Sequence, residues 1–194
     1  DKILLFIHQV QSGVSEPILS KDAGFYLFTL PFYETLYGVV LQLSIIGLGA
    51  IIVSYFFRFT EGSVDIVRTR DPDSEDSRTI AMLYVNAALV AVVLAFGRLL
   101  SRYHLLFSDW GTVSGPGWTD VHVRMPAYLI AFVLTLLVGA AILLPQARSA
   151  AQGLYRRVAP RAVVSPLVPL YAAAGAIAAV WIVTLWAVPF AFQK

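Results

Sequence analysis

The fold is decided by the stretch PFYETLYGVVLQLSIIGLGAIIVSYFF, residues 31–57, whose only charged residue is Glu34. A bilayer core of about 30 Å requires roughly 20 apolar residues in a helix. The stretch is longer than this minimum, so the helix is either tilted or begins with a turn in the membrane interface. It predicts a first transmembrane helix.

Three further apolar runs of similar length follow it, at residues 79–100, 125–144 and 166–190. The 194-residue chain is 58% hydrophobic and only 13% charged, whereas a soluble domain carries about 25% charged residues. We therefore expect an all-α polytopic membrane protein with four transmembrane helices and an aromatic-rich extracytoplasmic loop. The predicted parts are an extracytoplasmic or interfacial segment (1–30), a four-helix domain (31–190) containing the loop 101–124, and a tail (191–194).

Small residues recur within the predicted helices, where they allow neighbouring helices to approach closely. The positions that we expect at such contacts are Gly47, Ala88, Ala91 and Gly175. Arg98 lies one turn from the predicted end of the second helix, where its long side chain can reach the membrane surface.

Lysine and arginine are distributed unequally between the two sides of the predicted membrane domain. One side has eight (Arg58, Arg68, Arg70, Arg78, Arg148, Arg156, Arg157, Arg161), and the other has five (Lys2, Lys21, Arg102, Arg124, Lys194). Cytoplasmic loops carry the excess of positive charge. This places the connectors 58–78 and 146–165 in the cytoplasm, and both termini of the segment and the loop 101–124 outside it.

The connector 146–165 contains four arginines and no acidic residue. A short amphipathic surface helix at 148–158 would direct these arginines toward anionic lipid headgroups. Bound lipids are therefore expected, and no other cofactor is.

Aromatic residues gather on the predicted outer side, at the mouth of the first helix and in the loop. Aromatic rings are enriched at membrane–water interfaces because they combine an apolar body with a polar edge. The residues that we expect to act as interfacial anchors are Phe25, Tyr26, Phe28, Tyr103, Trp110, Trp118 and Arg124.

The outer loop also contains side chains that can ligate a metal: His104, Asp109, Asp120 and His122. Asp120 and His122 would face the same way on an extended segment. A metal site requires three or four converging ligands, and these residues flank a glycine-rich turn instead. The favoured interpretation is structural: Asp109 and Asp120 accept backbone N–H bonds in turns and pair with Arg102 and Arg124.

Two segments resemble a known family. DAGFYLFTLPF (22–32) and YHLLFSDWGTVSGPGWTDVHVRMP (103–126) are similar to the patterns D-[IV]-G-F-Y-x-F-x-L-P-F and Y-x-L-L-F-S-x-x-G-x-V-x-G-x-x-Y-T-D-V-x-x-R-x-P of uncharacterised protein family 0182, which consists of large bacterial polytopic membrane proteins. Ala23 and Trp118 depart from the patterns without changing their character. The resemblance implies the bacterial cytoplasmic membrane, and only the middle of a member, with further helices before Asp1 and a large extracytoplasmic domain after Lys194. It implies no activity.

Several classes of function have no support in the sequence. The absence of cysteine excludes disulfides and thiolate sites, the few loop arginines form no nucleic-acid-binding stripe, and no catalytic motif is present. We expect a non-catalytic accessory or structural subunit of a larger membrane assembly, of which a respiratory or photosynthetic complex is one setting. Its partners are then the lipid bilayer and other membrane subunits. The alternatives are the membrane part of a transport or export machine, which predicts a water-accessible path beside Gln42, Asn86 and Arg98, and a lipid-modifying enzyme.

Overall fold

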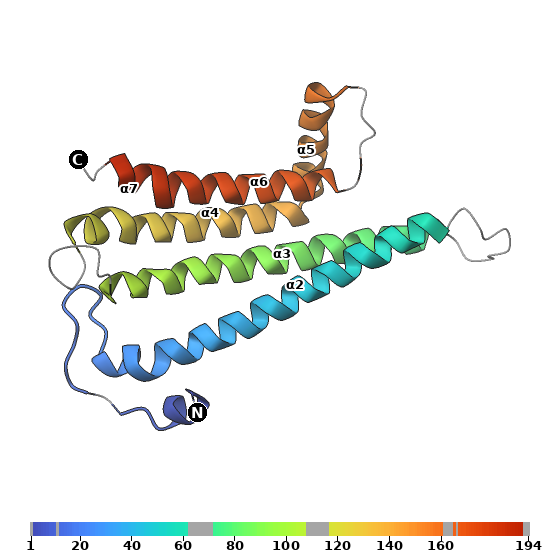
Figure 1. Cartoon of the computed structure of the whole chain (residues 1–194). Helices are drawn as coiled ribbons and strands as arrows, with labels where there is room; N and C mark the ends of the chain where they lie inside the picture. Colours follow the sequence, from blue (N-terminus) through green and yellow to red (C-terminus); the bar gives the residue numbers. More distant parts are fainter. Residues whose placement is uncertain are drawn as a thin grey trace.

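A computed structural model of the chain describes residues 2–10, 12–61, 72–107, 117–160, 165 and 167–191, with side chains described for all of these except 58–61 and 72–76. Four helices among these residues are long and apolar enough to span a membrane, at Phe25–Phe57, Ser77–Phe107, Asp120–Leu143 and Val168–Ala191. They lie side by side as an elongated bundle (Figure 1). The predicted all-α fold with four transmembrane helices is confirmed.

The elements follow one another in the order α1 (Lys2–Ile7), η1 (Phe25–Thr29), α2 (Leu30–Glu61), α3 (Pro72–His104), η2 (Leu105–Phe107), η3 (Asp120–Arg124), α4 (Met125–Leu143), α5 (Pro145–Val158), α6 (Val168–Ile182), η4 (Val183–Ala187) and α7 (Val188–Ala191). We call the end of the bundle at which η1, η2 and η3 lie the cap end. The opposite end of α4 and α6, where α5 lies, is the α5 end (Figure 1).

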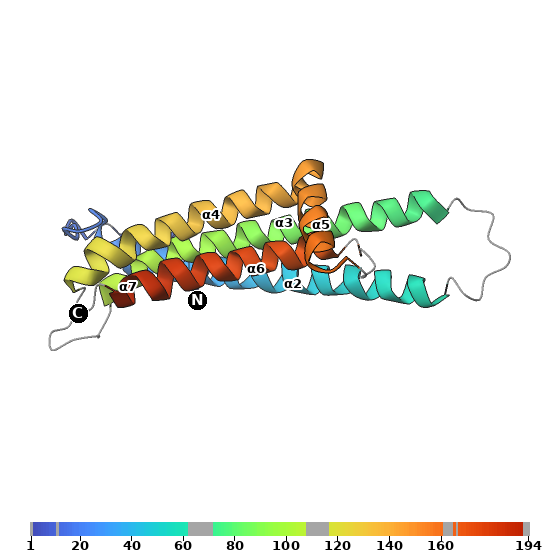
Figure 2. The same ribbon diagram turned by 90° about the horizontal axis from the view of Figure 1, so that it is seen from above.

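Helix α3 is central: it packs against α2 on one side and against α4 on the other, and α6 packs against α4. Figure 2 shows α3, α4 and α6 running alongside one another. Helices α3 and α4 are in close contact at Gly139, because a Cβ atom added to this glycine would lie 3.0 Å from Cβ of Ala91 and 3.6 Å from the carbonyl oxygen of Ala88. Small residues thus allow these two helices to approach closely.

Three of the spans contain a π-helical segment, in which the backbone bonds run from i+5 to i. These segments are η1, η3 and η4, and each is followed two residues later by a proline, namely Pro31, Pro126 and Pro189. Proline cannot donate the i→i−4 bond and its ring collides with the carbonyl of residue i−4. The wider turn accommodates the proline ring, as local π adjustments do in other membrane helices.

Because of these π-helical segments, two helices begin earlier than predicted. The first and third helices were expected to begin at residues 31 and 125, because proline is favoured in the first turn of a helix. Both spans begin earlier, at Phe25 and Asp120, since the π-helical segments let the helix continue through the proline.

The end of the second helix is also corrected. It was expected at residue 100, but α3 continues to His104 and is extended by the 3₁₀ turn η2. Ser101 donates to the carbonyl oxygen of Gly97 at 2.8 Å, one turn back within the helix, and Arg102 and His104 lie in the last turn, where positive charge is favourable. Residues 101–107 and 118–124 are helical, so the loop contains fewer residues than the predicted stretch 101–124.

Helix α5 runs across the direction of α4 and α6 in both views (Figures 1 and 2). The corner forms at Leu144, which is extended (φ −82°, ψ 123°) before Pro145. A residue before proline avoids the α conformation, while the proline itself suits the first turn of the next helix. A helix is present here as predicted, and it begins three residues earlier than expected, at Pro145. Its place at the membrane surface stays a prediction.

The four positions expected at helix contacts have different surroundings. Ala88 and Ala91 are buried against α4. A Cβ on Gly47 would lie 3.2 Å from the amide nitrogen of Asn86, so α2 approaches α3 closely there. At Gly175 no atom of the described residues lies within 4 Å of such a Cβ, so its predicted packing role could only involve a neighbour outside these residues.

Candidate functional site

The candidate site is the cap end, where segments 22–32 and 103–126 meet. The ring centroids of Phe25 and Tyr103 are 5.1 Å apart, and those of Tyr26 and Phe107 are 5.8 Å apart. The partners in each pair are about 80 residues apart in the sequence, so these contacts fix α2 against α3 at the cap end.

Asp22 organises the loop that precedes η1. Its carboxylate accepts backbone N–H bonds from Ser12 (3.1 Å), Gly13 (3.0 Å) and Gly24 (2.6 Å), and a bond from the Ser12 hydroxyl (3.0 Å). Gly13 has φ +71°, a conformation that glycine adopts without strain. The backbone N–H of Ser12, followed by that of Gly24, lowers the pKa of Asp22 below its ordinary value of 3.8. The ionised carboxylate is thus the form that holds the loop.

The Glu34 carboxylate contacts Nε2 of His104, which joins α2 to the last residue of α3. The sequence analysis named the two residues separately, Glu34 as the only charged residue of the stretch 31–57 and His104 as a side chain that can ligate a metal. Their separation of 70 residues gives no local signal, and only the packing of α2 against α3 brings them together.

Asp120 is 4% exposed and begins the span of α4. It accepts a bond from the guanidinium of Arg124 at 2.9 Å and one from the backbone N–H of Gly117 at 3.1 Å. These bonds confirm that Asp120 stabilises a turn and pairs with Arg124. The prediction was local, since the two residues are one helical turn apart.

Asp120 and His122 would face the same way only on an extended segment, and both lie instead in the π-helical segment η3. His122 is exposed and stacks on Trp118, with ring centroids 4.7 Å apart, and its Nδ1 lies 3.1 Å from the carbonyl oxygen of Trp118. A wide helical turn therefore directs the carboxylate and the imidazole to different partners.

The metal candidates are consequently occupied in separate contacts: His104 with Glu34, Asp120 with Arg124, and His122 with Trp118. In the described ranges no group of three or more His, Cys, Asp or Glu side chains could hold a metal ion. Asp109 lies outside these ranges.

The proposed interfacial anchors occupy the cap end as far as the structure describes them. Trp118 is 65% exposed, whereas Phe25, Tyr26, Phe28 and Tyr103 are half-buried among helices and rings. Trp110 lies outside the described residues. The anchoring role in the headgroup layer stays a prediction.

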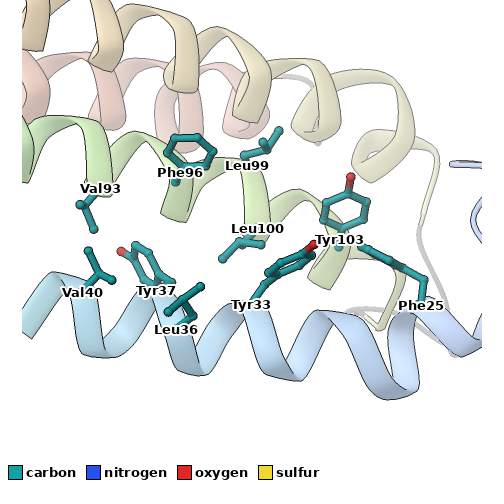
Figure 3. A pocket seen from close by; sticks show the side chains of 10 residues that line it. All are labelled: Phe25, Tyr33, Leu36, Tyr37, Val40, Val93, Phe96, Leu99, Leu100 and Tyr103. Carbon is teal, nitrogen blue, oxygen red and sulfur yellow. The ribbon is translucent and has the colours of Figure 1, made fainter. Parts of the chain in front are cut away.

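An open apolar groove of ≈400 Å³ separates α2 from α3 next to these rings. Figure 3 shows Tyr33 and Tyr37 on α2 and Phe96 and Tyr103 on α3 along its walls. The Tyr37 ring lies where a Cβ on Gly97 would be, so this glycine lets α2 remain close to α3. The groove is suited to apolar groups such as acyl chains.

Arg98 is an intramembrane cation with a different environment from the one predicted. Because α3 continues to His104, Arg98 lies deeper than one turn from the helix end. Its guanidinium lies 4.1 Å from the ring centroid of Trp181 on α6. Trp181 donates to the hydroxyl of Thr135 at 3.1 Å, and this hydroxyl donates to the carbonyl oxygen of Ala131 at 2.6 Å. The contacts join α3, α4 and α6 in one polar cluster, which sequence reasoning did not find because it cannot show which helices are neighbours.

A family model matches the whole chain, residues 1–194, and its description is uncharacterised protein family UPF0182. The chain belongs to UPF0182. Similar relatives include UPF0182 proteins of Pelobacter propionicus (35% identical over 146 residues), Pelotomaculum thermopropionicum (33% over 146 residues) and Geobacter sulfurreducens (34% over 140 residues). These matches cover 73%, 72% and 72% of the chain, respectively, and 15% of each relative.

The resemblance to this family is therefore confirmed, and the chain spans about 15% of the length of these UPF0182 relatives. No solved structure is significantly similar to it. The UPF0182 membership and the four apolar spans support a polytopic membrane protein.

Proposed function

We propose that this chain is a structural part of a larger membrane assembly, in which the uncovered face of α2 packs against a transmembrane helix outside the chain. Only 6% of the most apolar stretch of the α2 span is buried, compared with 39% for the span of α3. Lipid can cover an apolar face as well as protein can, so this exposure supports the proposal only together with the chemistry of the face.

The proposal depends mainly on Gln42, whose side-chain amide is exposed near the middle of the α2 span. Among the described residues it has no hydrogen-bond partner. Polar side chains inside a membrane usually face other protein groups and bond across helices. An amide exposed at this depth therefore favours a partner helix that supplies the missing bonds.

Two glycines lie on the same face of α2 as Gln42. Gly38 precedes it by four residues and Gly49 follows it by seven, which are helical neighbours at 3.6 residues per turn. Within the described part of the chain nothing lies within 4 Å of a Cβ at either glycine. A partner helix could therefore approach the backbone of α2 closely on both sides of the amide.

Site-specific photo-crosslinking tests this proposal. A photoreactive amino acid at Gln42 or Gly49 should capture a defined membrane segment of the same protein or of a partner subunit, when the protein is activated in native membranes. The control is Leu137 on α4, which is 59% exposed and should capture lipid. Lipid adducts alone at Gln42 and Gly49, as at the control position, would refute the proposal.

The substitution Gln42→Leu gives a second measurement, because it removes the amide and keeps an apolar side chain of similar size. It should reduce co-purification of the partner segment. Leu43→Ala, on an exposed neighbouring position, is the matched control and should leave co-purification unchanged.

The transport alternative has less support. Asn86 faces Gly47 on α2, Arg98 faces Trp181 on α6, and Gln42 is exposed on another face. These three polar side chains, expected beside one path, thus have three separate surroundings.

A further inference from the structure

Helix α5 is basic and lies across the ends of α4 and α6 (Figures 1 and 2). It carries Arg148, Arg156 and Arg157, and there is no acidic residue between positions 146 and 165. A helix that crosses the spans at their end lies along the membrane surface, where anionic headgroups attract arginine.

One face of α5 is apolar and borders a groove against α6. Leu154, Tyr155 and Val158 on α5, with Val168 and Tyr171 next to them, line a volume of ≈360 Å³. Leu154 is 64% exposed and Val158 is 78% exposed, so both remain available to an apolar ligand.

The three arginines have two different positions. The Arg148 guanidinium lies 4.4 Å from the ring centroid of Tyr84 and donates to the carbonyl oxygen of Leu143 at 3.2 Å, which fixes the start of α5 against the bundle. Arg156 and Arg157 are exposed. At 100° per residue Arg157 lies about 60° around the helix from Leu154, whereas Arg156 lies on the side opposite Leu154 and Val158.

We propose that α5 and α6 form a binding site for an anionic phospholipid, with an acyl chain in the groove, the phosphate group held by Arg157 next to Leu154, and Arg156 adding positive charge at the same end of α5. The groove would accept the chain of any phospholipid, so the arginines supply the preference for a negatively charged headgroup. A soluble phosphate compound has no chain for the groove and should not occupy the site. This proposal is independent of the partner helix on α2.

The test uses the protein in nanodiscs containing equal amounts of phosphatidylglycerol and phosphatidylcholine, followed by native mass spectrometry of the lipids it retains. The wild-type protein should retain phosphatidylglycerol preferentially. In Arg156→Ala/Arg157→Ala the preference should fall by about tenfold or more, since each arginine near a membrane surface contributes on the order of 1 kcal/mol. Added glycerol 3-phosphate should not displace the lipid.

Three variants separate the site from general charge effects. Lys2→Ala/Lys21→Ala removes two exposed positive charges elsewhere and should leave the preference unchanged, as should Arg156→Lys/Arg157→Lys. Ala172→Trp, which fills the groove beside Val158, should reduce retention of phosphatidylglycerol although both arginines remain. The proposal would be overturned if Lys2→Ala/Lys21→Ala reduced the preference for phosphatidylglycerol as much as Arg156→Ala/Arg157→Ala does. It would also be overturned if both the arginine-to-alanine variant and the groove variant retained phosphatidylglycerol as the wild-type protein does.

Discussion

The contact of Gly139 with α3 predicts that even one added methyl group separates the two central helices. In Gly139→Ala the new Cβ would lie 3.0 Å from Cβ of Ala91 and 3.6 Å from the carbonyl oxygen of Ala88, whereas carbon atoms pack best at about 3.5–4.0 Å. Both partners are close to or part of the α3 backbone, so the strain cannot be removed by turning a side chain. Overpacking of this kind costs about 1–3 kcal/mol.

The control for this variant is Gly175→Ala, at which no described atom lies within 4 Å of the new Cβ. Replacing glycine by alanine inside a helix is itself favourable by about 0.5–1 kcal/mol, because alanine has less backbone freedom to lose. That contribution is common to both variants and cancels in the comparison. Gly139→Ala should therefore be less stable than Gly175→Ala by about 1–3 kcal/mol.

The assay is reversible unfolding in mixed micelles, followed by tryptophan fluorescence and far-ultraviolet circular dichroism. The double variant Ala91→Gly/Gly139→Ala exchanges the two small residues and should recover most of the loss. If Gly139→Ala and Gly175→Ala were equally stable, or if Ala91→Gly gave no recovery, the close contact of α3 and α4 would not limit their packing.

Three further predictions concern the ends and the interior of the bundle. Asp22→Asn should speed amide exchange in the loop before η1, and unchanged exchange in this variant would show that the carboxylate does not hold the loop. In the unmodified protein the loop should also lose protection as the pH falls below about 3.8. The pKa of Asp22 is lowered in the folded protein, so the stabilisation by its carboxylate is complete above the pKa of the unfolded chain and is lost at lower pH. Trp118→Ala should increase proteolysis of the outer loop in intact membranes, and equal cleavage rates would contradict the anchoring role. Trp181→Phe keeps a ring beside Arg98 but removes the bond to Thr135, so it should cost about 1 kcal/mol in the same unfolding assay, whereas Thr135→Val combined with it should cost little more.

The sequence predicts the four spans well because each depends only on a local property, a run of about 20 apolar residues. The ends of the spans are less predictable. Pro31 and Pro126 indicate helix starts by a local rule, but each lies just after a π-helical segment that lets the helix begin earlier. The polar residues that follow position 100 indicate a loop, yet they form the last turn of α3.

In the candidate site, too, only contacts between residues close in the sequence could be predicted. The pair of Asp120 and Arg124 could be predicted, because its members are four residues apart. The pair of Glu34 and His104 and the stacking of Arg98 on Trp181 could not, because they depend on which helices are neighbours. A single sequence shows which helix faces are apolar, but it does not show which helices pack against each other.

The proline that follows each π-helical segment affects how the bundle can bend. Each of these prolines removes one hydrogen bond that would resist bending of its helix. The three segments η1, η3 and η4 all lie toward the cap end (Figure 1), while α3 has no proline after its first residue. The three spans that contain η1, η3 and η4 should therefore bend most easily at the cap end, whereas α3 should bend least. Distances between spin labels should accordingly vary more across the cap end than across the tightly packed layer at Gly139.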